Sequence, residues 1–268
     1  MGANTKALKS RIRSVDSTMH LTHAMGLVAS SKMRRATANM HNGRQYAAAF
    51  EDVMDVLTAC PECASSPYMQ KHEGERTRLI VIAGDRGLAG GYNANVFRLT
   101  DSMEKEMVIP VGKRACDRYK GAFHSSEYFS GDDALEMAKK LCEDFVNNEF
   151  DRLGIVSTRY ISMMSQEAYV TWVLPLERKE GEVKTIDAIF EPDEQTILES
   201  VVPDYLAGMI MRAIRESFAS EVAARRMAMD SAGKNAQAMI DNLTLQYNRA
   251  RQGAITQEIT EIVAGSDA

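Results

Sequence analysis

The apolar positions near the start of the chain fall on one long line. Steps of four and three residues, taken alternately from Leu8 to Leu57, give fifteen positions, of which twelve are apolar and three are Thr or Gly. No charged residue lies on this line, and no proline precedes Pro61. An apolar residue every 3.5 residues predicts a helix that packs along a coiled-coil seam. We therefore expect a helix from about Asn4 to Leu57. We call these positions the N-terminal seam: Leu8, Ile12, Val15, Met19, Thr22, Gly26, Ala29, Met33, Ala36, Met40, Gly43, Ala47, Phe50, Met54 and Leu57.

The end of the chain predicts a second long helix. The stretch from Asp204 to Val263 contains no proline. Either helix would be roughly 80 to 90 Å long at 1.5 Å per residue, against about 30 Å for a small domain, so each must extend beyond such a domain. The small seam residues favour an antiparallel coiled coil of the two helices. Its apolar line, the C-terminal seam, comprises Ala236, Ile240, Leu243, Tyr247, Ala250 and Ala254.

The pattern changes between the two helices. Short β-branched runs at 78–84 and 153–160 and an alternating run at 168–177 predict strands, and 132–150 predicts an amphipathic helix. Strands that alternate with helices indicate an α/β domain with a largely parallel sheet. We expect this Rossmann-like domain at 75–190, inserted into the coil.

The predicted fold class is therefore α/β, with a long antiparallel coiled coil of the N- and C-terminal helices and an inserted Rossmann-like α/β domain. The coil helices are assigned to 1–60 and 204–265. A plain coiled-coil spacer is the simpler alternative. It gives no reason for the glycines inside the predicted helices, each of which costs about 1 kcal/mol relative to alanine. These are Gly26, Gly43, Gly233 and Gly253.

A glycine-rich stretch, GDRGLAGGYN at 84–93, follows the first predicted strand. Rossmann-like proteins bind phosphate at this place. The spacing differs from G-x-G-x-x-G, and Tyr92 and Asn93 stand where a phosphate loop needs Lys and Ser or Thr. The residues alone leave two alternatives, a nucleotide or anion site and a tight turn that needs positive φ. The glycines are Gly84, Gly87, Gly90 and Gly91.

Charge adds a candidate partner surface. The net charge is -5, but residues 1–45 hold eight Lys and Arg against the single acid Asp16, a net charge of +7. A basic arm on an acidic body indicates an anionic partner, which could be nucleic acid, an acidic protein or a membrane surface. The cationic run at 30–36 lies on this arm, although such runs are often only a solvated face. We expect neither a signal peptide nor a membrane span, because no apolar run is long enough.

The candidate chemical groups do not form a catalytic site. Cys60 and Cys63 have CxxC spacing, but the other two of the four cysteines lie far away, so a closed zinc site is not expected. We expect reduced thiols with a structural role. His20 and His23 lie beside the seam without an expected carboxylate partner, so we interpret them as surface residues. No H-E-x-x-H or G-x-S-x-G motif occurs. We therefore predict no catalytic, cofactor-binding or metal residues.

Over nearly its whole length the chain resembles the gamma subunit of the rotary F-type ATP synthase. Two stretches look like the N-terminal helix and the glycine loop of that family, and two look like its last sheet strands and its C-terminal helix. They occur in the family's order. They are TMHLTHAMGLVASSKMRRA (18–36), GDRGLAGGYNANV (84–96), IVSTRYISMMSQ (155–166) and the stretch from FASEVAARRM to EITEIVAG (218–265).

The resemblance implies a non-catalytic central rotor shaft. The coil would turn inside a ring of α and β subunits, and each orientation would stabilise a different state of a catalytic β subunit. The α/β domain would sit on the membrane rotor c-ring beside the epsilon subunit, on the cytoplasmic face of a bacterial cell membrane. The resemblance implies no cofactor and no nucleic acid, and it makes the glycine loop a turn rather than a nucleotide site.

The resemblance also implies contact residues for the β subunit. Met25 matches the family's methionine at the coupling region, and a cationic cluster and four polar positions match β contacts. Gly26, Ala89 and Ser266 depart from the family's usual residues without affecting the assignment. The cluster is Lys32, Arg34 and Arg35, and the polar positions are Arg225, Gln252, Thr256 and Glu258.

Two other functions remain as rivals. A nucleotide-dependent enzyme with coiled-coil arms should bind ATP or NAD as the isolated chain. A coiled-coil adaptor could use its basic arm on nucleic acid, and that binding should weaken steeply with salt. Few aromatic residues accompany the basic residues of the arm, which argues against stacking on single strands.

Overall fold

The computed structural model describes residues 2–122, 124–178 and 190–266. The domain predicted at 75–190 includes residues 179–189, which lie outside the described residues. The elements in chain order are α1 (Gly2–Ala59), η1 (Pro61–Ser65), η2 (Pro67–Met69), β1 (Thr77–Ile82), α2 (Tyr92–Asp101), β2 (Met107–Val111), α3 (Lys113–Tyr119), α4 (Gly131–Val146), β3 (Arg152–Tyr160), β4 (Gln166–Leu174) and α5 (Glu194–Ser266).

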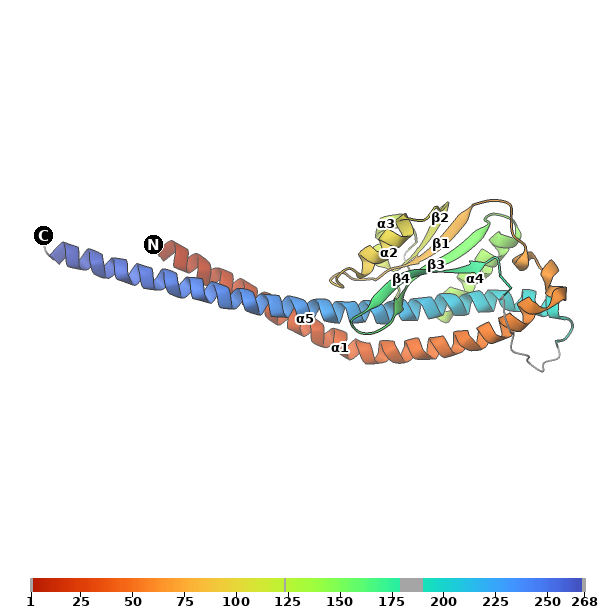
Figure 1. The fold of residues 1–268 in the computed structure, drawn as a ribbon, viewed down its shortest axis with the longest axis horizontal. Helices are drawn as coiled ribbons and strands as arrows, with labels where there is room; N and C mark the ends of the chain where they lie inside the picture. Colours follow the sequence, from red (N-terminus) through yellow and green to blue (C-terminus); the bar gives the residue numbers. More distant parts are fainter. Residues whose placement is uncertain (1, 123, 179–189, 267–268) are drawn as a thin grey trace. The chain divides into compact units, whose positions relative to one another are not determined.

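The chain divides into two compact units. Unit 1 consists of Met1–Ser30 and Arg225–Ala268, and unit 2 consists of Ser31–Ala224. The described residues of unit 1 are all helical and come from the start of α1 and the end of α5. Unit 2 contains the sheet together with the remaining parts of both long helices (Figure 1). The assignment of residues to 1–60, 75–190 and 204–265 stays a prediction.

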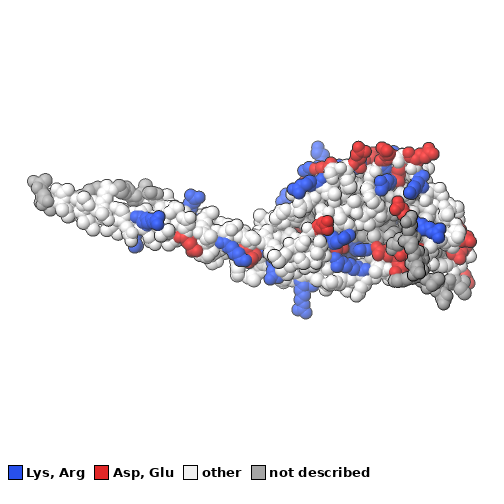
Figure 2. Space-filling model, viewed as in Figure 1, with Lys and Arg blue, Asp and Glu red and all other residues white. Residues whose placement is uncertain are grey.

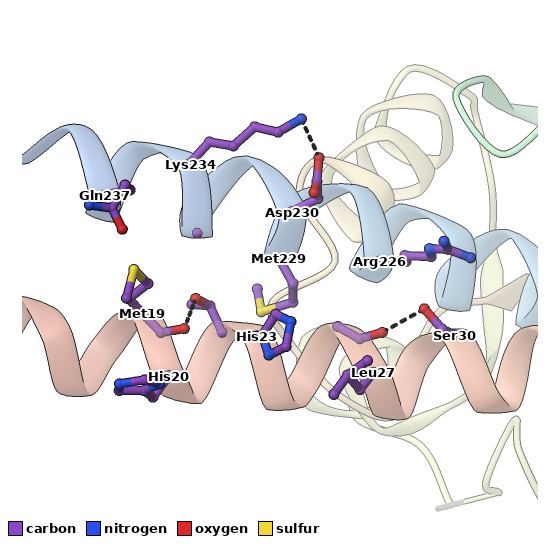
Figure 3. A pocket seen from close by; sticks show the side chains of 13 residues that line it. Met19, His20, His23, Leu27, Ser30, Arg226, Met229, Asp230, Lys234 and Gln237 are labelled. Atoms are coloured by element: carbon purple, nitrogen blue, oxygen red, sulfur yellow. Dashed lines mark hydrogen bonds and ion pairs between the residues drawn. The ribbon is translucent and has the colours of Figure 1, made fainter.

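The seam pattern produces the N-terminal helix. Every position of the N-terminal seam is buried or half-buried, and so is every position of the C-terminal seam. In unit 1 the residue numbers rise along α1 where they fall along α5, so the two helices run antiparallel (Figure 3). The predicted antiparallel pairing is confirmed.

The C-terminal helix is longer than predicted. It begins at Glu194 rather than Asp204 and carries Pro203 inside it. Asp193 starts it, because its carboxylate accepts from the Thr196 backbone N–H at 2.8 Å and from Thr196 Oγ1 at 2.8 Å. A proline inside a helix costs about 3 kcal/mol. Burial of the side chains on both sides offsets this cost, namely those of Leu198, Val202 and Leu206, each at most 1% exposed.

The sheet has the strand order β2-β1-β3-β4. β1 pairs in parallel with β2 and β3, and β3 pairs antiparallel with β4. The predicted strands at 78–84, 153–160 and 168–177 correspond to β1, β3 and β4, and the helix predicted at 132–150 corresponds to α4. The largely parallel sheet is therefore confirmed, although β2 and α3 were not predicted.

Alternate side chains of the strands face two different layers. Ile80 and Ile82 of β1 lie in the main core with Phe145 of α4 and with buried residues of both long helices. Leu79 and Val81 face the other side, where Val96 of α2 packs against them. This alternation follows from the two-residue period of a strand. The sheet thus lies between α2 on one face and α4 with the long helices on the other.

Helix α5 also bonds to the end of β3. The register of β1 with β3 ends at the pair Val81 and Val156, so the rest of β3 needs other partners on that side. The Thr158 N–H donates to Ser217 Oγ at 3.0 Å, and the Tyr160 N–H donates to Glu216 Oε1 at 3.1 Å. Side chains of α5 therefore supply the hydrogen-bond acceptors that a neighbouring strand would supply along this part of β3.

Candidate functional site

Five of the predicted contact residues lie in unit 1. Met25 on α1 and Arg225 on α5 are half-buried. Gln252, Thr256 and Glu258 are exposed on the last turns of α5, where Thr256 Oγ1 donates to the Gln252 backbone oxygen at 3.0 Å. Met25 can therefore influence both the packing of the coil and its surface. The three residues near the end of α5 present their side chains outward.

The glycines inside unit 1 sit at ordinary packing distances. A Cβ added to Gly26 would lie 3.7 Å from Met229 Cβ, and one added to Gly233 would lie 3.8 Å from Thr22 Oγ1. An alanine fits at either position. An added Cβ would already be in van der Waals contact with the other helix, which agrees with the expected close approach at small residues. Both glycines also line an open space between the two helices.

That space is a cavity of about 610 Å³ between α1 and α5 of unit 1. Met19, His23 and Leu27 line it from α1 (Figure 3). The α5 wall includes Met229 and Gln237. Met side chains adapt readily to a changing partner surface, so this groove suits a contact that alters as its surroundings move.

The histidines beside the groove need one correction. His20 has a carboxylate neighbour, since Asp16 Oδ1 lies 3.7 Å from His20 Nε2, one helical turn away. The His20 side chain is 75% exposed, so its interpretation as a surface residue stands. Among the residues that the structure describes, no group of three His, Cys, Asp or Glu side chains could hold a metal ion.

Unit 1 leaves many large apolar side chains uncovered. On α1 these include Leu21, at 60% exposure, with Leu27 and Val28. Figure 2 shows uncharged residues, in white, between scattered charged side chains along the coil. Large exposed apolar patches indicate a protein–protein contact. Sequence reasoning missed this surface, although apolar residues off the seam line could have revealed it. On α5 the exposed residues are Met239, Leu245, Ile255, Ile259, Ile262 and Val263.

The predicted cationic cluster lies in unit 2 and does not act as one group. Lys32 is half-buried, and its Nζ forms an ion pair with Glu127 Oε1. Arg34 and Arg35 are exposed. Lys32 and Arg35 line a common cavity. Two of the three cations therefore remain available at the surface for an anionic partner.

The glycine loop is shaped by packing and by turn geometry. Gly90 has φ 57°, and Leu88 also lies in the left-handed region with φ 62°. A Cβ on Gly84 would come within 2.6 Å of Glu221 Cδ on α5, and that glutamate is only 3% exposed. Glycine at this position thus leaves room for the buried Glu221 carboxylate beside the loop. These contacts favour the turn over the nucleotide site.

Asp85 fixes the same loop to its neighbours. Its carboxylate accepts from the Lys113 N–H at 3.0 Å, the Ser126 N–H at 3.1 Å and the Glu127 N–H at 3.1 Å. Burial opposes ionisation of Asp85, but these hydrogen bonds and one from Ser125 outweigh it and hold the pKa of the carboxyl below its usual value. A carboxylate of the chain itself therefore accepts the hydrogen bonds that these neighbouring segments offer beside the loop.

The cysteines do not form a reactive pair. Cys60 follows α1 and Cys63 is buried in η1, and all four cysteines are free. Burial, with a smaller effect of the neighbouring Cys60, raises the pKa of Cys63 to about 11, and burial raises that of Cys142 to about 12. The thiolate is the reactive form, so both thiols are inert near neutral pH.

Comparison with known proteins agrees with these features. A family model described as ATP synthase matches residues 4–268. The ATP synthase gamma chain of Moorella thermoacetica is 39% identical, with 99% of each chain covered. That of Ruminococcus albus is 40% identical, with 98% of each covered. The sodium ion specific gamma chain of Acetobacterium woodii is 37% identical, with 100% of this chain and 99% of the relative covered.

Solved structures share the fold at lower identity. A chain of the Euglena gracilis mitochondrial ATP synthase, in a structure of OSCP, F1 and c-ring, aligns with a TM-score of 0.69 at 18% identity and covers 100% of this chain and 95% of that chain. A central stalk and c-ring structure from Tetrahymena thermophila gives a TM-score of 0.59 at 21% identity, over 79% of this chain and 99% of that chain. No helix in the described ranges is long and apolar enough to cross a membrane. With relatives this similar along its whole length, the chain belongs to the ATP synthase gamma chain family.

Proposed function

We propose that this chain is the central shaft of an F-type ATP synthase and couples ion flow through a membrane rotor to the catalytic cycle of the β subunits. The exposed apolar surface of the coil in unit 1 carries the proposal. A surface of this kind needs a surrounding partner. A ring of α and β subunits provides one on every side. The chain itself is non-catalytic in this proposal.

The shaft would act by differential contact. A ligand shifts a conformational equilibrium only by the difference in its affinity for the two states, and a rotating asymmetric rod presents a different surface to each β subunit. Met25, Arg225, Gln252, Thr256 and Glu258 are the proposed contacts on unit 1. Lys32, Arg34 and Arg35 are the proposed contacts on unit 2, where the two exposed arginines suit an acidic segment of β.

The α/β part would form the foot of the rotor. We propose that it docks on the c-ring beside the epsilon subunit, on the cytoplasmic face of a bacterial cell membrane. The descriptions of the Euglena and Tetrahymena structures support this proposal, because both name a c-ring together with the central parts of the enzyme.

Co-purification tests the proposed function directly. The tagged chain is expressed with the α and β subunits of the same cell, and the purified complex is assayed for ATP hydrolysis. Recovery of α and β, with hydrolysis that depends on this chain, would support the shaft. A chain that purifies alone and binds ATP or NAD would instead support the nucleotide-dependent enzyme, and salt-sensitive binding of nucleic acid would support the adaptor.

Replacing Met25 by lysine is expected to reduce the coupling of ATP hydrolysis to ion pumping. A cation at this half-buried position would change the contact between the shaft and a β subunit, and by different amounts in different orientations of the shaft. A coupling energy of about 1 kcal/mol corresponds to about a fivefold effect. Ion pumping per ATP hydrolysed, measured in vesicles that contain the complex, should fall by about this factor while hydrolysis persists. Met25→Leu keeps an apolar side chain and should pump normally; unchanged pumping in Met25→Lys would remove Met25 from the proposed contacts.

Residues 10–40 are expected to exchange amide hydrogens quickly in the isolated chain. Most of the stability of a helix in a protein comes from packing, and apolar side chains such as Leu21 and Leu27 are exposed without the ring. Hydrogen exchange by mass spectrometry should show slow exchange in β1 and β3 and fast exchange in 10–40, with protection regained in the complex. Equal protection of 10–40 and β3 in the free chain would contradict the need for a surrounding partner.

A further inference from the structure

A second cavity, of about 330 Å³, lies in unit 2 between α1, α5 and the residues that precede α4. We call it the cationic cavity. Ala36, Ile214 and Phe218 give it an apolar part. Ionic interactions are stronger beside such apolar groups than in open water. The polar lining comes from three separate segments, and its residues are Lys32, Arg35, Asn39, Ser126, Glu127 and Arg215.

The charges of this lining do not balance. Lys32 pairs with Glu127, and Arg86 Nη2 also lies 3.8 Å from Glu127 Oε2. Arg35 and Arg215 also line the cavity, and neither forms an ion pair within the ranges that the structure describes. The lining thus holds three cations and one carboxylate, a net charge of +2. Two unmatched arginines that face one cavity favour a bound anion.

A buried hydroxyl in the same lining also needs a partner. Ser126 is 4% exposed, and its Oγ has no hydrogen-bond partner among the described residues. Buried polar groups are nearly always hydrogen-bonded, so an exception calls for a ligand or water. The Ser126 Oγ is buried, so its side chain would rotate toward the cavity to donate to an anion, and the amide of Asn39 offers further donors. Both residues belong to the same cavity lining as the unmatched arginines.

The loop that carries Ser126 is held in place. Asp85 Oδ2 accepts from Ser125 Oγ at 2.5 Å, and both carboxylate oxygens accept backbone N–H groups of the next two residues. The backbone of Ser126 is therefore held by Asp85, while its hydroxyl takes no part in these hydrogen bonds. A site whose groups are already in position binds with a smaller loss of entropy.

We propose that the cationic cavity binds a phosphate-class oxyanion. The net charge of the lining suits a dianion, whereas a single carboxylate would leave one arginine unmatched. Guanidinium groups recognise phosphate oxygens with paired hydrogen bonds, and serine and asparagine supply neutral donors for the remaining oxygens. Free phosphate and the phosphate group of a nucleoside monophosphate share this chemistry. The proposal does not depend on the shaft function.

Calorimetric titration of the full chain with inorganic phosphate tests the site. Saturable binding is expected, and Arg215→Gln should weaken it by about tenfold, since a charge-assisted hydrogen bond accounts for that much. Arg34→Gln is the matched control, because Arg34 is a neighbouring exposed cation outside the cavity lining. Arg35→Gln changes an exposed residue and serves if Arg215→Gln fails to fold, as judged by circular dichroism.

The same titration with adenosine monophosphate and with acetate identifies the ligand. Tighter binding of the nucleotide than of phosphate would assign the site to a nucleoside phosphate, and equal or weaker binding would assign it to free phosphate. Acetate that binds as tightly as phosphate would overturn the proposal in favour of a carboxylate site. It would also be overturned by the absence of saturable binding, or by equal losses in Arg34→Gln and Arg215→Gln. Co-purification with α and β is a separate measurement, so each proposal can fail alone.

Discussion

Replacing Glu216 by alanine is expected to lower the free energy of unfolding by about 3 kcal/mol, the low end of the range for a broken buried ion pair. Glu216 is 2% exposed, and its Oε1 accepts from both Arg44 Nη2 and the Tyr160 N–H. Arg44 is 35% exposed and reaches water more easily than Glu216, so water can solvate its charge in part when the carboxylate is removed. The Tyr160 N–H would lose its partner beside the helix, and this loss adds to the cost.

The position of Glu216 makes its effect larger than that of an ordinary ion pair. Arg44 comes from α1, Glu216 from α5 and Tyr160 from the end of β3, and Arg44 Nη2 also donates to the Tyr160 oxygen at 3.0 Å. One carboxylate thus joins both long helices to the sheet at the place where β1 no longer pairs with β3. In a rotor, torque between the helices and the foot would pass through such bonds.

Urea unfolding of the full chain measures this effect. Glu51→Ala is the matched control, because Glu51 pairs with Arg212 between the same two helices, with side chains 32% and 29% exposed. Both side chains of this pair are half-buried and reach water more easily than the Glu216 carboxylate, so Glu51→Ala should cost less than Glu216→Ala. Glu216→Gln keeps an oxygen acceptor for the Tyr160 N–H. Its loss of unfolding free energy should therefore lie between those of Glu51→Ala and Glu216→Ala. Equal losses in Glu216→Ala and Glu51→Ala would show that the buried pair has no special role.

The coil was predictable because its signal is long. Fifteen positions without a charge fix both the helix and the face it buries, and every one of them is buried or half-buried. The start of α5 was not predictable from the same rule, since Pro203 ended the proline-free stretch. Packing of Leu198 and Leu206 outweighs the cost of the proline, and only the folded chain shows that packing. The Asp193 cap was a local signal that could have corrected the start.

The sheet shows why short elements escape detection. β2 is an edge strand of MVIPV, and its proline is a residue that argues against a strand. An edge position tolerates the proline because one side of the strand needs no partner. α3 spans Lys113–Tyr119, which is too short for a helical period to stand out. Both elements depend on tertiary contacts with β1 and its following loop.

The candidate site was predicted unevenly. The resemblance supplied Met25 and the polar contact positions, which no pattern in the residues alone distinguishes. The sequence placed Lys32 with Arg34 and Arg35, but the ion pair of Lys32 with Glu127 joins residues far apart in the chain and could not be foreseen. The exposed apolar residues of unit 1 could have been found, because they are apolar and lie off both seams.

Replacing Gly112 by alanine is expected to destabilise the chain by about 3 kcal/mol or more. Gly112 has φ 90°, a conformation that costs about 1–3 kcal/mol for other residues. An added Cβ would lie 1.9 Å from the Ala83 oxygen, a backbone atom that cannot rotate away. The backbone would have to shift, and overpacking of this kind costs about another 1–3 kcal/mol. The cost of the positive φ and the cost of the overlap with the Ala83 oxygen have separate causes, so they add up at this residue.

Gly112 lies beside the start of the glycine-rich stretch in the fold, although α2 and β2 separate the two in the chain. Ala83 directly follows β1, and its N–H donates to the Val111 oxygen at 2.9 Å, which holds its backbone in place beside β2. The Gly112 N–H in turn donates to the His124 oxygen at 2.7 Å, so the same residue ties β2 to the loop before α4. Gly112 therefore has a stricter need for glycine than Gly87 or Gly91, although it stands outside the glycine-rich stretch.

Thermal unfolding of Gly112→Ala beside Gly131→Ala separates backbone strain from the general effect of adding a methyl group. Gly131 begins α4, its φ is not positive, and nothing lies within 4 Å of an added Cβ. Its replacement should be neutral or stabilise by about 0.4–1 kcal/mol, because the unfolded chain loses freedom. If Gly112→Ala unfolds at the same temperature as Gly131→Ala, then the approach of β2 to Ala83 is not as close as the structure has it. If only Gly112→Ala loses stability, the turn after β2 depends on this one glycine, and the loop that carries Ser126 depends on it too.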